Sequence, residues 1–375
     1  SFFLLLISVF YFFIINNTNA FEWPTSAEIP LLERIISSSF LNNDFYTNSA
    51  IDSPKVFFSY FVYSFTFLGF DYNQSLYFLK FIVNIFSPIL IFIIYLRILL
   101  IINKQDYLKV KNSRIIKIIF LLSLPFFGFV QGYGYLTPFG WQAIQSITQI
   151  IPMKLSFFIG LIYLLIKFSN NNSFYSFIFL FISFLIHPII GISNFVIAFL
   201  ILAFSIDWSN KRLQLFYDLF LGIIIPAIFI ILIFNNPLSI SNEQFFDLYV
   251  KTRHPHHYYV SNILSFYSLF WMILVSIPLI ISIYLKNKKL ILFSCLCLML
   301  NISAVIVQYL FSEVYPIIFV MQSGPIRFLS YSTILISINI LLVMSYMIDK
   351  ENEIKNNDAI KNIFLIRKMF FITLI

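Results

Sequence analysis

The chain has 375 residues, of which 60% are hydrophobic and only 11% are charged, and its mean hydropathy is +0.90. An ordinary soluble domain has about 25% charged residues. The composition therefore excludes a soluble enzyme, a nucleic-acid-binding module and a disordered chain, and it predicts an integral membrane protein. The 49 Phe residues and the many Ile, Asn, Lys and Tyr residues are also typical of an AT-rich genome, so a single Phe or Asn carries little information.

Membrane-spanning helices need about 20 mostly apolar residues, and fewer when neighbouring helices bury them. The pattern of apolar runs predicts an all-α polytopic transmembrane helical bundle that forms one domain over residues 1–375, with about eleven spans and with both termini truncated. The predicted spans are 1–15, 76–102, 115–131, 152–168, 174–186, 189–206, 215–234, 263–285, 290–310, 327–347 and an incomplete 361–375. Cys295 and Cys297 lie two apart in one of these runs, where a helix points them to different faces, so we expect neither a disulfide nor a metal pair.

The segment 54–70 is apolar as well, but a Pro begins it, it is rich in Ser and aromatic residues, and Asp52 and Asp71 flank it. We interpret it as an interfacial helix that lies on the membrane surface. With that choice the basic residues separate into 16 on one side of the membrane and six on the other, while Lys80 and Arg97 remain in or at the ends of a span. The more basic side is expected to be cytoplasmic.

Long loops collect on the opposite, outer side. They are the first outer loop at 16–75, which contains the interfacial helix, followed by 132–151, a His-rich loop at 235–262, and 311–326. Long irregular loops in a compact protein are usually functional, so we expect the functional site on the outer side. The sequence contains no internal repeat, P-loop or Gly-rich dinucleotide motif.

The first outer loop places Glu22, Glu28 and Glu33 ahead of Asp44. A carboxylate at this position could act as a general base on a sugar hydroxyl, or it could coordinate a divalent cation. The alternative interpretation is a solvated loop in which Asn and Asp form turns.

The His-rich loop holds three of the four His residues, in the run Arg253-His254-Pro255-His256-His257. Imidazole and guanidinium groups can donate hydrogen bonds to phosphate oxygens, so the run suits an anionic headgroup. A zinc site is disfavoured because adjacent His256 and His257 cannot readily share one ion. The alternative interpretation is an interfacial belt of His and Tyr.

The fourth histidine, His187, precedes Pro188 where two short apolar segments meet, which predicts a broken helix of the kind that lines cavities. It belongs either to the same site as the other three or to the core. Arg327 opens an apolar run and is either an interfacial anchor or a cation at the mouth of a cavity. The aromatic residues of 131–142 offer a sugar platform or an ordinary aromatic belt.

Taken together, the acidic first loop with Asn-Asp-Phe-Tyr-Thr at 43–47, the interfacial helix, His-Pro at 187–188, the run 253–257 and the late Arg327 resemble a family of uncharacterised bacterial polytopic proteins. That family is similar to membrane glycosyltransferases of the C-type superfold (GT-C). The resemblance covers about 20–345, and its most specific parts are Asp44 and 253–257. It implies a polyprenyl-phosphate sugar donor, a catalytic acid in the first outer loop, and surface helices after it.

By this resemblance Asp44 is the catalytic residue that deprotonates or orients the acceptor hydroxyl, and no dedicated metal site is implied beyond a possible divalent cation. The substrate-binding residues would be Arg253, His254, His256, His257, Arg327, His187 and Glu28. Paired acids are common in the superfold, whereas this chain has Asn43-Asp44, which leaves metal dependence and activity open. The expected location is the bacterial cytoplasmic membrane, with the site facing the periplasm or exterior and with membrane lipid as a partner.

Two other classes stay open. A transporter or lipid flippase would use His187 and Arg327 as substrate or proton relay groups, and it would need polar groups along a path through both leaflets. Lys80, Arg97 and Asp218 are the main ionisable residues in or near the spans, and their spacing indicates no such path. An inactive membrane subunit of polysaccharide assembly would keep the fold without needing Asp44. The residues specify neither the sugar and its acceptor nor an oligomeric state.

Overall fold

The computed structural model describes residues 25–41, 44, 47, 51, 54, 56–103, 150–169, 175–203, 208–234, 241–253, 259–263 and 266–354. Within these residues all regular structure is helical, so the predicted all-α fold is confirmed for them. Three of the described helices are long and apolar enough to cross a membrane, namely Tyr72–Ile101, Lys211–Ile233 and Lys288–Val314. The predicted spans 1–15, 115–131 and 361–375 lie outside the described residues, and a bundle of eleven spans stays a prediction.

The helices before the middle of the chain are α2 (Thr25–Ile36), α4 (Val56–Tyr63), η1 (Ser64–Leu68), α5 (Tyr72–Asn103), α8 (Pro152–Lys167), α9 (Ser176–Ile186) and α10 (Pro188–Ala203). The later ones are α11 (Trp208–Leu219), η4 (Phe220–Ile224), α12 (Ile225–Ile233), α13 (Asn242–Phe245), η5 (Phe246–Arg253), α15 (Val260–Ile263), α16 (Phe266–Tyr284), α17 (Lys288–Tyr309), η6 (Leu310–Val314), α18 (Ile318–Ser323), η7 (Pro325–Arg327) and α19 (Phe328–Ile354).

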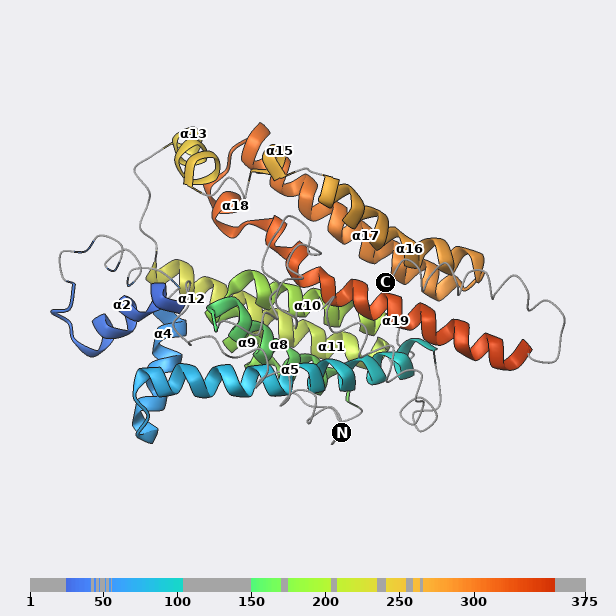
Figure 1. Ribbon diagram of the computed structural model, residues 1–375, viewed down its shortest axis with the longest axis horizontal. Helices are drawn as coiled ribbons and strands as arrows, with labels where there is room; N and C mark the ends of the chain where they lie inside the picture. Colours follow the sequence, from blue (N-terminus) through green and yellow to red (C-terminus); the bar gives the residue numbers. More distant parts are fainter. Residues whose placement is uncertain are drawn as a thin grey trace.

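Helices α5, α16, α17 and α19 run along the long axis of the molecule, and α4 runs across the direction of α5 (Figure 1). The chain turns between them because Gly69 ends η1 in the left-handed region, at φ 86°. Asp71 then begins α5, since its carboxylate accepts a hydrogen bond from the backbone N–H of Gln74 at 2.7 Å. Helix α4 lies within the segment 54–70, and its predicted position on the membrane surface stays a prediction.

The predicted break at His187 is confirmed. His187 has an extended backbone at φ −155° and ψ 98° between α9 and α10, as expected for a residue before Pro188. The two helices pack against each other at close range. Gly191 permits this approach, since a Cβ there would lie 2.6 Å from the Cα of Phe184. At 11 residues, α9 rises only about 16 Å, which is shorter than the hydrocarbon core of a bilayer.

A π-helical turn, η4, joins α11 and α12 into one continuous helix. Pro226 follows this turn and has no N–H to donate to a carbonyl of the preceding turn, so a local widening of the helix relieves the lost bond. Gly222 lies in the π-helical turn against Leu180 of α9, where a Cβ would meet the Leu180 side chain at 2.8 Å.

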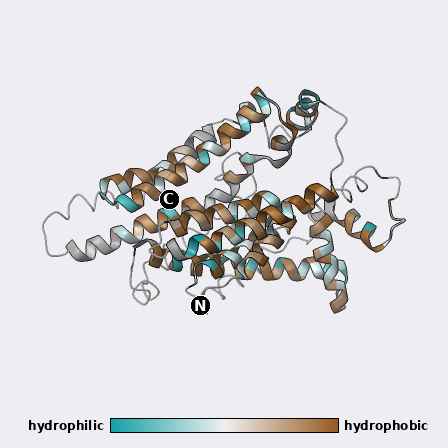
Figure 2. Cartoon of the chain, turned by 180° about the vertical axis from the view of Figure 1, so that it is seen from behind, coloured by the Kyte–Doolittle hydropathy of each residue, from teal (hydrophilic) through white to brown (hydrophobic). Residues whose placement is uncertain are grey.

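The main hydrophobic core is formed by buried residues of α5, α8, α10, α17 and α19 with parts of α9, α11 and α16. Tyr95 of α5 also donates a hydrogen bond across this core to the Leu341 carbonyl of α19 at 3.2 Å. The long helices are hydrophobic over most of their length, while the short α13 is largely hydrophilic (Figure 2). The helix 211–233 lies at the periphery, with apolar side chains such as Phe216 and Leu232 exposed.

The two ends of the bundle differ. Helices α2, α4, α13, α15 and α18 gather toward one end (Figure 1), which we call the loop end. The opposite end contains the turn between α16 and α17 with Lys286, Lys288 and Lys289, and we call it the basic end. The loops predicted on the outer side and described by the structure therefore lie at the same end of the bundle.

Candidate functional site

Two helices of the first loop cover the loop end of the bundle. Their buried side chains form one hydrophobic cluster with the ends of three other helices. It contains Leu32 of α2, Phe58 and Val62 of α4, Leu76, Leu79 and Val83 of α5, Leu155 and Ile159 of α8, and Ile186 of α9, together with Ile150. We call α2 and α4 the cover. The cover positions the first loop above the ends of α5, α8 and α9.

Two lysines lie inside the bundle beneath this cover. Lys80 of α5 is fully buried and Lys154 of α8 is 3% exposed. Their chain neighbours Leu79 and Leu155 belong to the same cluster, and the two lysine side chains interact electrostatically. Lys80 Nζ lies 5.9 Å from the centre of the Tyr77 ring, which is a cation–π distance.

Lys154 is one of the six basic residues that the charge count assigned to the outer side, and the structure adds that its side chain is buried. It lies in the first turn of α8 and is buried with the helix. Its position between Met153 and Leu155 in a predicted span is the signal that points to it, because ionisable residues inside spans are commonly functional.

Asp44, the predicted catalytic residue, is partly exposed in the loop after α2. Its carboxylate accepts a hydrogen bond from the backbone N–H of Thr47 at 2.7 Å. The Thr47 hydroxyl and this N–H hold the pKa of Asp44 below its ordinary value, although only the N–H meets hydrogen-bond geometry. Asp44 is therefore ionised at neutral pH, and it is better suited to orient a hydroxyl than to remove its proton.

His187 is half buried at the same end, directly after Ile186 of the covered cluster. Its backbone N–H donates to the Ser183 carbonyl at 3.0 Å, which closes the last turn of α9. His254, His256 and His257 lie outside the described residues, so a site shared by all four histidines stays a prediction.

Arg253 ends η5 and Arg327 ends η7, and the structure describes the backbone of both residues. The segment of Arg253 packs against α18, because Val250 of η5 and Met321 of α18 are buried in one cluster. Ile326, next to Arg327 in η7, is buried in a separate cluster with Val260 of α15. Glu28 lies in α2 of the cover, and its backbone alone is described.

A carboxylate fastens the His-rich loop to the end of α17. Glu313 of η6 accepts a hydrogen bond from the Ser261 backbone N–H at 3.1 Å, and its other oxygen accepts one from the Ser261 hydroxyl. The predicted outer loops 235–262 and 311–326 are thus held together. This group and the covered cluster are separate hydrophobic clusters within the described residues.

Polar side chains connect α8, α9 and α10 at Ser156, two residues after Lys154. The Ser156 hydroxyl donates to the Ser183 carbonyl at 2.7 Å, and the Ser183 hydroxyl donates to the Ser156 carbonyl at 2.9 Å. Asn194 Nδ2 donates to the Ser183 hydroxyl at 3.2 Å. Gly160 gives Asn194 its space, since a Cβ there would meet Asn194 Nδ2 at 1.8 Å.

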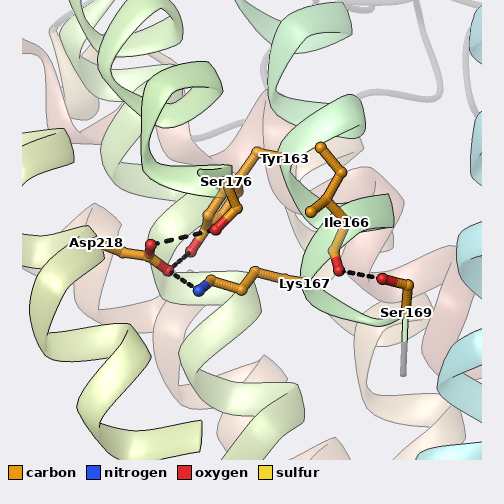
Figure 3. Close-up of polar contacts among 6 residues, drawn as sticks. All are labelled: Tyr163, Ile166, Lys167, Ser169, Ser176 and Asp218. Atoms are coloured by element: carbon orange, nitrogen blue, oxygen red, sulfur yellow. Dashed lines mark hydrogen bonds and ion pairs between the residues drawn. The ribbon is translucent and has the colours of Figure 1, made fainter. Parts of the chain in front are cut away.

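A buried ion pair lies at the other end of α8 (Figure 3). Lys167 Nζ is 2.7 Å from Asp218 Oδ2, and the side chains are 2% and 1% exposed. The Tyr163 hydroxyl donates to the same carboxylate at 3.0 Å and the Ser176 hydroxyl at 3.4 Å. The sequence analysis counted Lys167 among the 16 basic residues of the cytoplasmic side and named Asp218 only as an ionisable residue in or near a span. The structure pairs the two, because the fold brings the end of α8 beside α11.

Among the residues that the structure describes, no three His, Cys, Asp or Glu side chains gather in a way that could hold a metal ion. The His-rich run is not among those residues. A divalent cation at the loop end therefore stays a prediction.

Comparison with protein-family models, with curated proteins and with solved structures finds no match to this chain. The resemblance to membrane glycosyltransferases rests on the residues quoted above, chiefly 43–47 and 253–257. A function is therefore argued from the geometry of the loop end.

Proposed function

We propose that this chain is a membrane glycosyltransferase that transfers a sugar from a polyprenyl-phosphate donor at the loop end, which faces the exterior or the periplasm. The observation that carries the proposal is the cover, in which α2 and α4 pack over the ends of α5, α8 and α9. Asp44 lies in the loop between these two helices. A carboxylate above a membrane-embedded bundle can meet an acceptor from water and a donor from lipid.

In this reaction the acceptor oxygen attacks the anomeric carbon, and the bond between that carbon and the phosphate oxygen breaks. The donor leaves as polyprenyl phosphate, and the acceptor proton passes to a carboxylate or to the departing phosphate. Asp44 orients the acceptor hydroxyl, because its lowered pKa keeps it ionised. Positively charged side chains at the loop end stabilise the negative charge that develops on the phosphate. The candidates are Arg253, Arg327 and the histidines next to Arg253.

The test uses the full-length protein in lipid nanodiscs with a panel of radiolabelled polyprenyl-phosphate sugars and candidate acceptors. We expect wild type to convert at least one donor and Asp44→Asn to reduce turnover by 100-fold or more, on the order of a lost catalytic carboxylate. Asp247→Asn is the matched control, since Asp247 of η5 is 64% exposed and pairs only loosely with Lys251 at 3.6 Å. Equal turnover in wild type and Asp44→Asn would remove Asp44 from the mechanism.

One observation favours a transporter as the second candidate. Buried polar side chains follow α8 from one end to the other, in the order Lys154, Ser156, Tyr163 and Lys167. A path of ionisable and polar groups through a bundle is typical of ion and substrate translocation. Under this alternative, the protein in sealed vesicles would move a lipid-linked or soluble anion across the membrane without altering the anion chemically.

A further inference from the structure

The helix 211–233, which is formed by α11, η4 and α12, is embedded in the bundle through its first half. Its buried residues recur every three or four positions and are Leu215, Asp218, Gly222 and Pro226. No residue from 227 to 233 is buried. Over the most apolar part of this helix 17% of the residues are buried, against 67% in helix 72–101. The bundle therefore holds the two halves of the helix to different degrees.

Three contacts fix the first half. Leu215 packs in the main hydrophobic core. Asp218 pairs with Lys167 of α8 at 2.7 Å, with both side chains buried (Figure 3). At Gly222 the helix approaches α9 so closely that a Cβ would lie 2.8 Å from the Leu180 side chain. Moving α11 away would leave two buried charges without their partners, which is costly, so α11 stays in place.

The second half is connected to the cover by aromatic contacts. Phe229 of α12 and Phe234, which directly follows it, contact Phe57 of α4, with ring centres 6.1 and 5.8 Å apart. Helix α12 also lies beside α9, but it buries no side chain after Pro226. Its apolar side chains are exposed, and Leu232 is 76% exposed.

A membrane makes these contacts easy to exchange. Lipid tails are as apolar as leucine side chains, so no hydrophobic driving force holds an apolar helix against its neighbours in a bilayer. An α12 that moves away from α4 replaces contacts with protein by contacts with lipid chains. The movement therefore costs chiefly the aromatic contacts of Phe57.

A joint lies between the two halves. The turn η4 is π-helical, and in it the Ile225 N–H donates to the Phe220 carbonyl five residues earlier. Pro226 follows and has no N–H to donate. Helices bend at prolines and at π-helical turns, and such turns are frequent at functional sites. The helix is thus least constrained where its buried face ends.

We propose that helix 211–233 is hinged: the ion pair of Asp218 fixes α11, and α12 pivots at η4 so that its end moves toward and away from Phe57 of the cover. The moving end lies near α2 and α4 at the loop end (Figure 1). Because Asp44 lies between α2 and α4, the position of α12 controls how firmly the loop of Asp44 is held above the bundle. That role in catalysis rests on the proposed function, whereas the hinge itself does not.

The test measures distances between two spin labels by double electron–electron resonance, on the full-length protein in phosphatidylcholine nanodiscs. Cys295→Ala and Cys297→Ala first remove the native thiols. Ile280→Cys in α16 carries the reference label, because Ile280 is 63% exposed. The second label is at Leu232→Cys in α12 or, as the matched control, at Leu213→Cys in α11, which is 59% exposed. We expect a major and a minor distance for the α12 pair and a single distance for the α11 pair.

Two substitutions act on the hinge in opposite directions. Phe57→Ala removes the ring that meets Phe229 and Phe234, and it should raise the minor population of the α12 pair about threefold or more. Pro226→Ala restores an N–H to the helix and should lower that population. The α11 pair should keep its single distance in both variants, which shows that the bundle stays folded.

A single distance for the α12 pair that Phe57→Ala does not alter would overturn the hinge. Equal displacements of the α12 and α11 pairs would also overturn it, because the helix would then move as one rigid body. The measurement needs no sugar donor, so the two proposals fail separately. Distances that respond as expected while no donor is consumed keep the hinge and reject the glycosyltransferase, whereas donor turnover with a rigid helix keeps the enzyme and rejects the hinge.

Discussion

The ion pair between Lys167 and Asp218 permits a quantitative test of how the bundle is held together. The two charged atoms lie 2.7 Å apart and both side chains are almost completely buried. Lys167→Met removes one charge and leaves the Asp218 carboxylate in the interior with the hydroxyls of Tyr163 and Ser176. The substitution therefore lowers the free energy of unfolding, mainly because the Asp218 carboxylate stays buried without its cation.

Breaking one side of a buried ion pair costs about 3–5 kcal/mol. We expect Lys167→Met near the lower limit, about 3 kcal/mol, because two hydroxyl donors still satisfy the carboxylate. The double variant Lys167→Met with Asp218→Leu removes both charges and should recover to within about 1 kcal/mol of wild type, since hydrophobic replacement of a buried pair is often neutral. The effects of Lys167→Met and Asp218→Leu on the free energy of unfolding are therefore expected to be strongly non-additive.

The assay is reversible unfolding of the full-length protein in mixed micelles with increasing SDS, followed by tryptophan fluorescence. Lys251→Met, which removes the exposed partner of Asp247 at 3.6 Å, is the matched control; it should cost less than about 1 kcal/mol. If Lys167→Met unfolds within about 0.5 kcal/mol of wild type, the pair is not a buried structural contact and the reasoning fails.

Two further outcomes are expected. Gly191→Ala should destabilise the protein by about 1–3 kcal/mol in the same assay, because the new Cβ would lie 2.6 Å from the Cα of Phe184 and the α9 and α10 backbones must part; an unchanged free energy of unfolding would contradict the close packing. A hydrogen bond from its own backbone N–H, and then one from the Ser241 hydroxyl, lower the pKa of Glu243 from 4.5. Its contribution to the order of α13 is therefore present above pH 4.5 and lost as the pH falls through the lowered pKa. Hydrogen exchange at Gln244 should accelerate over that pH range, beyond the intrinsic trend, in wild type but not in Glu243→Gln, and equal profiles would refute the assignment.

Local sequence signals predicted several features that the structure confirms. The composition predicted helices suited to a membrane, since so few charged residues are available to face water. His187 before Pro188 predicted the break between α9 and α10, because proline restricts the residue before it. The apolar run 54–70 predicted a helix, and α4 and η1 lie within it, while its place on the membrane surface stays a prediction. Each of these features depends on a few neighbouring residues.

The tertiary structure alone decided which charges meet inside the bundle. Lys80 and Lys154 are far apart in the sequence, as are Lys167 and Asp218, so no local pattern relates them. A lysine in an apolar run can extend to the membrane surface or turn into the bundle, and periodicity does not distinguish the two. The packing of α5 against α8, and the contact between Lys167 of α8 and Asp218 of α11, make that choice, because burial depends on which helix faces meet in space. The sequence by itself determined a helical membrane protein, and the packing of its helices determined where its buried charges lie.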